Sequence, residues 1–370
     1  MIVAFRTDAS LDIGTGHVMR CLALAGALRE SGSSCMFISR ALPGHLADRI
    51  ANEGFDVTLL PSPESSAPTG PPSHAAWAGV GWAQDATETR AEFREKPDWL
   101  VVDHYAFDAR WQQGARSEGT RLMVIDDLAD RPHSCDLLLD QNFAHFSDHY
   151  DGLLPEAAIR LIGPQYALLR PEFAAARAGT LTARARRRGL KRLMISMGGV
   201  DVVDATSAIL EALRAAPLPA DLEISVVMGG RAPALDKVRE IARGMPRQTE
   251  VVVDVDDMAA RMATADLAIG GGGTTTLERC CLGLPSIVVE TAANQAGMAE
   301  AIASAGAGLA SAPLYDPVFA HGIRDAMVKA TCPAHLATMS EAAAEICDGN
   351  GSTRVIEQMN RCKESEVQVL

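Results

Sequence analysis

The sequence lacks the features that mark several broad classes of protein. No apolar run is long enough to cross a membrane, and the apolar start Met1 to Phe5 is closed by Arg6 and Asp8 before it reaches the length of a secretory signal. The eight cysteines are scattered without a Cys-x-x-Cys pair, which argues against a disulfide framework and against a zinc site. We therefore expect a cytoplasmic protein with reduced thiols.

Positive charge is also scarce, since 34 lysines and arginines face 47 aspartates and glutamates and leave a net charge of −13. An acidic surface does not attract nucleic acid or an anionic membrane, so we expect neither partner. The carboxylate pairs Asp126-Asp127 and Asp256-Asp257 are adjacent in sequence, and such side chains diverge on a strand instead of sharing a metal ion. We expect no metal, no cofactor and a monomer, with any phosphate of a substrate held by backbone N–H groups and dipoles.

Length and residue pattern predict two domains of parallel α/β type. The 370 residues exceed what one core usually supports, and 48% hydrophobic residues with only 5% aromatics suit an aliphatic interior of helices on parallel strands. Strand-like runs alternate with helical stretches at 2–5, 34–39, 57–60, 99–103, 121–125 and 137–139, and again at 192–196, 223–228, 249–253, 267–269 and 286–289. Residues 61–74 are rich in Pro, Ser and Gly and are expected to form a loop.

The domain boundaries follow from a change in composition. The segment 178–190 is rich in arginine and is interpreted as a solvated linker rather than a binding patch. We therefore expect an N-terminal domain at 1–177, a linker at 178–190, a C-terminal domain at 191–350 and a tail at 351–370.

A strand, a glycine turn and a helix start are predicted near the N-terminus. Gly14 and Gly16 fall between the apolar run 2–5 and the helical spacing of 18–28. Glycines let a ligand approach the backbone, and the helix N-terminus behind them presents free N–H groups to an anion. His17 lies at this helix start, where the helix dipole favours a neutral ring that can accept a proton. A surface histidine on an ordinary turn is the alternative interpretation.

A second glycine-rich turn follows the strand-like run 267–269. Gly270 to Gly273 lead into Thr274 to Thr276 at a predicted helix start, and such hydroxyl and N–H groups can hold phosphate without a lysine or a metal. Threonine N-capping is the alternative. Glu278, one turn into the helix, is suited to accept hydrogen bonds from a ribose diol, or else to close a capping box.

These two turns belong to a longer series of motifs that resembles, in the same order, the UDP-sugar hydrolases of pseudaminic acid biosynthesis, usually called PseG. These hydrolases are relatives of the GT-B glycosyltransferases typified by MurG. The resemblance extends to about Gly308 and is carried by Arg6–Cys21, Val101–Tyr105, Val124–Pro132, Leu138–Asn142, Gly163–Phe173, Ser196–Asp201 and Gly270–Gln295. The chain departs from the family by having glycines and threonines where alanine and serines are expected, and Leu277 where an aromatic residue is frequent.

The resemblance implies a GT-B-like α/β fold, with two Rossmann-type parallel-sheet domains facing a central cleft. It implies catalytic roles for His17, as the base that activates water, and for Tyr105 and Asn294. Substrate binding is implied for Arg6, Asp8, Gly14, Gly16, Asp103, His104, Gly199, Val255, Met258, Gly272, Gly273, Thr274, Thr275, Glu278 and Gln295. Among these, the threonines would hold the diphosphate, Glu278 the ribose, and the Val255 loop the uracil.

The predicted function is metal-independent hydrolysis of UDP-2,4-diacetamido-2,4,6-trideoxy-β-L-altropyranose to UDP and the free sugar. Water would attack the anomeric carbon, in the biosynthesis of a nonulosonic (pseudaminic) acid. A GT-B glycosyltransferase with a UDP-sugar donor needs the same base and phosphate cradle and remains the alternative, and an inert nucleotide-sugar-binding protein is a third possibility. Hydrolysis is favoured because the sequence shows no apolar, basic membrane-docking face and no segment that resembles an acceptor-binding domain.

Overall fold

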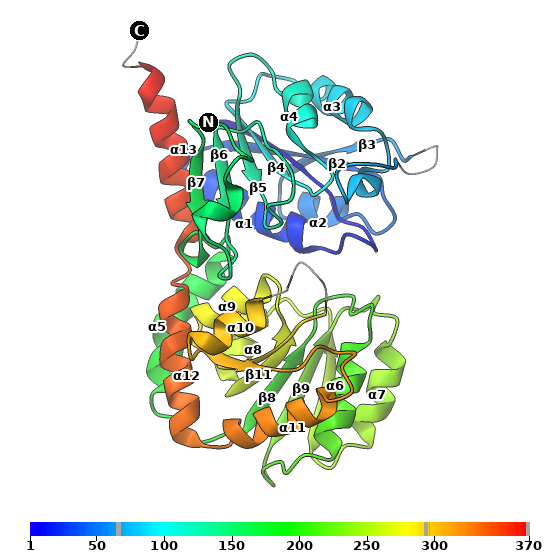
Figure 1. Ribbon diagram of the computed structural model, residues 1–370, viewed down its shortest axis with the longest axis vertical. Helices are drawn as coiled ribbons and strands as arrows, with labels where there is room; N and C mark the ends of the chain where they lie inside the picture. The colour runs from blue at the N-terminus through cyan, green and yellow to red at the C-terminus, as the bar shows by residue number, and fades with distance from the viewer. Residues whose placement is uncertain (64–67, 292–294, 296, 368–370) are drawn as a thin grey trace. The chain divides into compact units, whose positions relative to one another are not determined.

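The computed structural model describes residues 1–63, 68–291, 295 and 297–367 (Figure 1). The chain divides into two compact units: unit 1 comprises Met1–Leu168 and Asn350–Leu370, and unit 2 comprises Leu169–Gly349. Each unit is built on one parallel β-sheet, of seven strands in unit 1 and six in unit 2. Among the helices of the described residues, none combines the length and the apolar character needed to cross a membrane.

The sheet of unit 1 has the strand order β3-β2-β1-β4-β5-β6-β7 and carries helices on both faces. Its strands are β1 (Ile2–Thr7), β2 (Ser34–Arg40), β3 (Asp56–Leu60), β4 (Trp99–Asp103), β5 (Arg121–Ile125), β6 (Leu137–Asp140) and β7 (Ile159–Ile162). Its helices are α1 (Gly16–Glu30), α2 (Ala47–Asn52), α3 (Trp82–Ala91), α4 (Ala109–Ala115) and α13 (Gly351–Val367), with short turns of 3-10 helix at η1 (Ala75–Ala78), η2 (Ser147–Tyr150) and η3 (Pro164–Tyr166).

Alternation along β1 explains why both faces of this sheet are covered. Successive side chains of a strand point to opposite faces. Val3 and Phe5 join the core shared with α1 and α13, whereas Ala4 joins the core shared with Trp111 of α4. The near-continuous apolar runs seen in the sequence follow from this two-sided burial.

The sheet of unit 2 has the order β10-β9-β8-β11-β12-β13. Its strands are β8 (Arg192–Ser196), β9 (Glu223–Met228), β10 (Gln248–Val253), β11 (Leu267–Gly271), β12 (Ser286–Val289) and β13 (Gly308–Ala310). Its helices are α5 (Pro171–Arg184), α6 (Ala205–Arg214), α7 (Leu235–Arg243), α8 (Met258–Thr264), α9 (Thr275–Cys281), α10 (Met298–Ser304), α11 (Phe319–Ala330) and α12 (Pro333–Ile346). The prediction of two Rossmann-type parallel-sheet domains is confirmed.

The direction of strand addition reverses once in each sheet. In unit 1 the reversal lies between the neighbours β1 and β4, and in unit 2 it lies between β8 and β11. In open parallel sheets, ligands bind outside the carboxyl ends of the strands at such a reversal. The loops after these four strands are therefore candidate ligand sites, and both glycine-rich turns lie among them.

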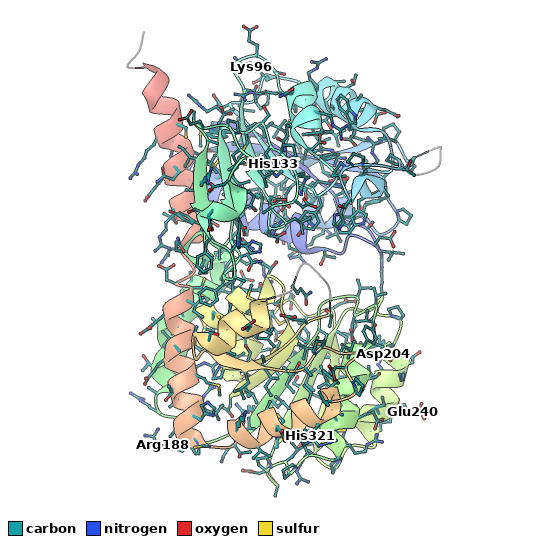
Figure 2. All side chains as sticks on the ribbon, in the orientation of Figure 1. Lys96, His133, Arg188, Asp204, Glu240 and His321 are labelled. Atoms are coloured by element: carbon teal, nitrogen blue, oxygen red, sulfur yellow. The ribbon has the colours of Figure 1, made fainter. Side chains whose placement is uncertain are left out.

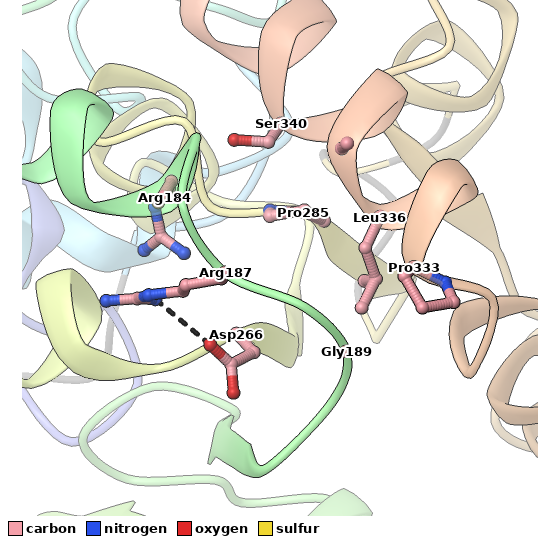
Figure 3. Close-up of a pocket in the computed structure, with 9 residues that line it drawn as sticks. Arg184, Arg187, Gly189, Asp266, Pro285, Pro333, Leu336 and Ser340 are labelled. Atoms are coloured by element: carbon pink, nitrogen blue, oxygen red, sulfur yellow. Dashed lines mark ion pairs between the residues drawn. The ribbon is translucent and has the colours of Figure 1, made fainter.

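The arginine-rich segment after residue 178 is not a solvated linker, so that interpretation is wrong. Its first part continues α5, and Arg184 is buried, with its guanidinium donating to the carbonyls of Met262, Ala265 and Leu282. Arg187 donates to the carbonyl of Ala265. It also forms a 3.1 Å ion pair with Asp266, which Figure 3 shows. The end of α8 leaves carbonyls without helical partners, and these arginines satisfy them. The cavity in Figure 3 adjoins the amino end of β11, opposite to the end that carries the glycine turn.

The segment expected to be a C-terminal tail contains a long helix, α13, which belongs to unit 1. This helix, red in Figure 1, packs against α1 and η3. Val355, Ile356 and Met359 join the core beneath α1. Their spacing places these three side chains on one helix face. The charged residues that flank them, at positions 354, 361, 363, 364 and 366, weakened the helical signal in the sequence.

Candidate active site

The loop after β1 leads into the first turn of α1, where His17 lies. The loop is closed on itself, because the Gly14 N–H donates to the Ser10 carbonyl at 2.9 Å. The Ser10 hydroxyl also accepts from the N–H groups of Asp12 and Ile13. Gly14 has φ of +79°, a conformation that L side chains rarely adopt, so glycine is required there. At Gly16 a Cβ would meet no atom within 4 Å, so that glycine leaves open space beside His17.

His17 is oriented by a buried carboxylate at the end of the neighbouring strand. Its Nδ1 lies 2.5 Å from Oδ1 of Asp103, the last residue of β4. An ionised carboxylate only accepts hydrogen bonds, so Nδ1 carries the proton and Nε2 is left as the proton acceptor. We expected Asp103 to bind substrate, but the structure buries it completely and places it behind the histidine.

Arg20 holds Asp103 in its ionised form, and sequence reasoning missed it. Its Nε and Nη2 donate to the two oxygens of Asp103 at 2.6 and 2.7 Å, and its Nη1 lies 3.1 Å from Asp127. Burial disfavours the Asp103 anion, but the Arg20 guanidinium beside it holds the pKa of that carboxyl well below its usual range. The signal was available in principle, because residues 17 and 20 share one face of a helix.

Tyr105 lies against His17, with ring centroids 4.6 Å apart and the planes nearly perpendicular. Its hydroxyl donates to Asp127, and burial together with that carboxylate raises the pKa of Tyr105 well above its usual value, so the phenol stays protonated. Two further rings complete the cluster: Trp77 stacks on Tyr105 at 5.5 Å, and His74 lies 5.4 Å from it. Neither ring was predicted, because both come from η1 and the loop before it.

Three of the residues expected to bind substrate are buried beneath this loop. Arg6 pairs with Asp8 at 2.6 Å and with Asp85 at 2.7 Å, and all three side chains are fully buried. His104 accepts the Ala106 N–H at Nδ1, so its Nε2 carries the proton and faces Asp8 at 3.2 Å. Burial lowers the pKa of His104 and keeps the ring neutral. Arg6, Asp8 and His104 therefore support the loop from below and expose no polar atom to a ligand.

In unit 2, Gln295 ties the loop after β12 to the glycine turn after β11. Its Oε1 accepts from the N–H of Gly272 and from the N–H and hydroxyl of Thr291, each at 3.2 Å. A Cβ at Gly272 would lie 3.2 Å from the Gln295 Cβ, so a side chain there would press the two loops apart. Gly273 is next in the turn and half-buried.

The threonines at the start of α9 have different surroundings. The Thr276 hydroxyl is fully engaged within the protein, since it donates to the Gly271 carbonyl at 3.1 Å and accepts from Arg279 at 2.9 Å. Thr274 occupies the N-cap position but makes no side-chain capping hydrogen bond. Thr274 and Thr275 are half-buried, and within the described part of the chain their hydroxyls make no hydrogen bond to protein. The structure thus does not show the N-capping that was the alternative interpretation of Thr274.

Glu278 follows one turn later on the same helix. Its side chain is 13% exposed, and its Oε1 lies 3.6 Å from Nη2 of Arg170. Burial raises the pKa of this carboxyl, although the cation opposes the shift. The carboxylate therefore keeps some access to solvent and acceptor capacity beyond its ion pair.

The other residues predicted for unit 2 lie at the same edge of its sheet. Gly199 follows β8 and accepts the Gly229 N–H at 3.0 Å, and Val255 and Met258 are half-buried after β10 and at the start of α8. Asn294 lies outside the described residues. The structure therefore gathers the predicted residues in two groups, one at the carboxyl edge of each sheet. Among the described side chains, no three His, Cys, Asp or Glu residues are grouped to hold a metal ion.

Two Rossmann-type units with these turns define a GT-B fold, and comparison with solved structures agrees. MurG of Acinetobacter baumannii superposes with a TM-score of 0.68 at 14% identity, covering 97% of this chain and 99% of that one. The glycosyltransferase of kitacinnamycin gives a TM-score of 0.65 at 19% identity, covering 97% of this chain and 98% of its own. At these identities the likeness concerns the fold alone.

Sequence comparison confirms the resemblance that the motifs indicated. The UDP-2,4-diacetamido-2,4,6-trideoxy-β-L-altropyranose hydrolase of Campylobacter jejuni is 26% identical over 263 residues, which are 71% of this chain and 81% of the hydrolase. The spore coat polysaccharide biosynthesis protein SpsG of Bacillus subtilis is 31% identical over 147 residues, 40% of this chain and 42% of SpsG. No family model matches the sequence.

Proposed function

We propose that the protein hydrolyses a UDP-linked 2,4-diacetamido-2,4,6-trideoxy hexose to UDP and the free sugar. The observation that carries the proposal is the His17–Asp103 pair at 2.5 Å, in which the buried carboxylate accepts a hydrogen bond from Nδ1–H and leaves Nε2 free to accept a proton. This is the arrangement of a general base with an orienting carboxylate. The sequence similarity to the Campylobacter hydrolase supports the choice of substrate.

In the proposed reaction, Nε2 of His17 removes a proton from water as the water oxygen attacks the anomeric carbon. The bond between that carbon and the phosphate oxygen breaks, and UDP leaves with the electron pair. Asp103 stabilises the imidazolium that forms, while Arg20 keeps Asp103 ionised. The hydroxyls of Thr274 and Thr275 and the N–H groups of their turn stabilise the charge that develops on the diphosphate.

The remaining assignments of unit 2 belong to the same proposal. Glu278 accepts from the ribose diol, the loop at Val255 and Met258 binds the uracil through its backbone, and the amides of Asn294 and Gln295 serve the sugar and phosphate. Metal-independent chemistry and action as a cytoplasmic monomer are part of this proposal as well.

A glycosyltransferase would use the same base on an acceptor hydroxyl instead of water, and the GT-B neighbours are consistent with that alternative. The experiment that separates the two is incubation with the UDP-sugar in the absence of any acceptor. Hydrolysis predicts UDP release at catalytic rates. Release that requires an added acceptor would identify a transferase, and tight binding with no turnover would identify a binding protein.

Turnover in ¹⁸O-labelled water with a chelator present is expected to place the label in the free sugar and none in UDP. Attack at carbon leaves the phosphate oxygens untouched, and the proposed base needs no metal to activate water. Mass spectrometry of both products measures the label. Label in UDP, or loss of activity with the chelator, would show that water attacks phosphorus and would refute this mechanism.

Glu278→Ala is expected to weaken UDP binding by about 1–3 kcal/mol, because the ribose hydroxyls lose a buried acceptor. Calorimetry with UDP measures the change. Glu172→Ala is a matched control, since Glu172 pairs with the same Arg170 at 2.9 Å but is 41% exposed. Unchanged affinity in the Glu278 variant, or an equal loss in the control, would reduce Glu278 to an ion-pair partner of Arg170.

A further inference from the structure

Three aromatic side chains form a wall beside the proposed base. This aromatic wall consists of His74, Trp77 and Tyr105, and its centroids lie within contact range of each other: 4.6 Å between His74 and Trp77, and 5.5 Å between Trp77 and Tyr105. Two of its rings face His17 edge-on, Tyr105 at 4.6 Å and Trp77 at 6.4 Å. Trp77 is half-buried, so part of its indole remains accessible beside the base.

The charged groups around this wall already have protein partners. The Tyr105 hydroxyl donates to Asp127, and Arg20 is shared between that carboxylate and Asp103. Arg131, whose guanidinium lies 5.8 Å from the Tyr105 ring, is paired with two aspartates, Asp126 at 2.7 Å and Asp130 at 2.8 Å. Within the wall itself, the Nδ1 of His74 is buried without a hydrogen-bond partner among the described residues. The faces of the Trp77 indole, by contrast, offer a ligand ring carbons and a π system.

Such a surface distinguishes between the edges of a sugar. A hydroxyl group placed against the indole face gives up hydrogen bonds to water and receives none of comparable strength in return, which costs free energy. A methyl group in the same place is removed from water at a gain. The indole face of Trp77 thus favours a sugar that carries methyl groups where common hexoses carry hydroxyls.

We propose that Trp77 determines sugar specificity by packing its indole against the methyl-bearing edge of a deoxygenated, N-acetylated hexose. This inference rests on the proposed function, because a sugar attacked by water at His17 has its ring within reach of the wall. The indole receives the 6-methyl and acetamido methyl groups. Trp77 takes no part in proton transfer and acts on the choice of substrate.

The test compares two UDP-sugars: a UDP-2,4-diacetamido-2,4,6-trideoxy hexose and UDP-N-acetylglucosamine, which keeps hydroxyls at C4 and C6. Trp77→Ala is expected to lower kcat/KM for the first by about 10- to 100-fold, the range for lost methyl contacts, and to change the second far less. Trp77→Phe should retain most of the preference. Trp82→Ala is the matched control, since Trp82 is 40% exposed and contacts Arg110 instead of the base.

An equal loss on both sugars, or no loss on either, would overturn the inference. Calorimetric titration of both UDP-sugars accompanies the kinetics and separates the two proposals. If the wild-type protein released no UDP, the proposed hydrolysis would be refuted. The specificity role of Trp77 would still be supported if the wild type bound the deoxy sugar more tightly than UDP-N-acetylglucosamine and Trp77→Ala lost that preference. If the wild type hydrolysed the deoxy sugar and Trp77→Ala kept the same preference, the proposed hydrolysis would be supported and the specificity role of Trp77 would be refuted. UDP alone should bind the variants and wild type equally.

Discussion

His17→Ala should lower kcat by about 10²- to 10⁴-fold, the scale of a positioned general base, with UDP affinity unchanged. The substitution removes Nε2, the acceptor for the proton of the attacking water. It leaves untouched the residues of unit 2 that are proposed to bind UDP. Steady-state release of UDP from the UDP-sugar measures the first effect, and calorimetry measures the second.

His321→Ala provides the control for this variant. His321 lies on the surface of α11 (Figure 2), where its side chain is 68% exposed and pairs with Asp325 one turn away. Its removal should leave both turnover and UDP affinity unchanged. Near-normal turnover by His17→Ala would exclude the histidine from the mechanism, and a parallel loss of UDP affinity would point to a disturbed fold.

Asp85→Ala is expected to lower the free energy of unfolding of unit 1 by about 3–5 kcal/mol. Asp85 is fully buried in α3 and accepts from Arg6 at 2.7 Å, from Arg40 at 2.6 Å and from the Trp111 indole at 2.9 Å. Burial opposes its ionisation, but Arg6 lowers the pKa of Asp85 below its usual value. The variant leaves two buried guanidinium groups short of a carboxylate, and this cost exceeds that of losing the hydrogen bonds alone.

Tryptophan fluorescence during urea unfolding isolates this effect, because all four tryptophans of the chain lie in unit 1: Trp77, Trp82, Trp99 and Trp111. Asp151→Ala is the control. Asp151 is 70% exposed and pairs with Arg160 at 2.7 Å, and such surface pairs contribute less than about 1 kcal/mol. Equal losses in the two variants would show that the buried network contributes no more than a surface ion pair.

Much of the sheet architecture was predictable from the sequence, because the strands are apolar runs ended by polar or turn residues. The predicted runs 99–103, 121–125 and 286–289 coincide with β4, β5 and β12. The strands that were missed, β7 and β13, lie at sheet edges. They are short, and edge strands need less apolar sequence because they have only one strand neighbour.

The residues that support the candidate site were less predictable, because their contacts join distant parts of the chain. His17 meets Asp103 across 86 residues, and Arg20 meets Asp127 across 107. A local motif indicates that a histidine lies at a helix start, but it does not indicate which strand ends beside that helix. Trp77 was missed for a similar reason, since its significance depends on Tyr105, which lies on another element.

Because α13 belongs to unit 1, the two units become complete at different times during synthesis of the chain. Unit 2 is one continuous stretch, Leu169–Gly349, whereas unit 1 is interrupted and needs Val355, Ile356 and Met359 to fill its core. A ribosome delivers these side chains only after it has synthesised the whole of unit 2. Domains generally fold as they are completed during synthesis. Unit 2 can therefore finish folding first, while the core of unit 1 beside α1 stays incomplete until α13 is released.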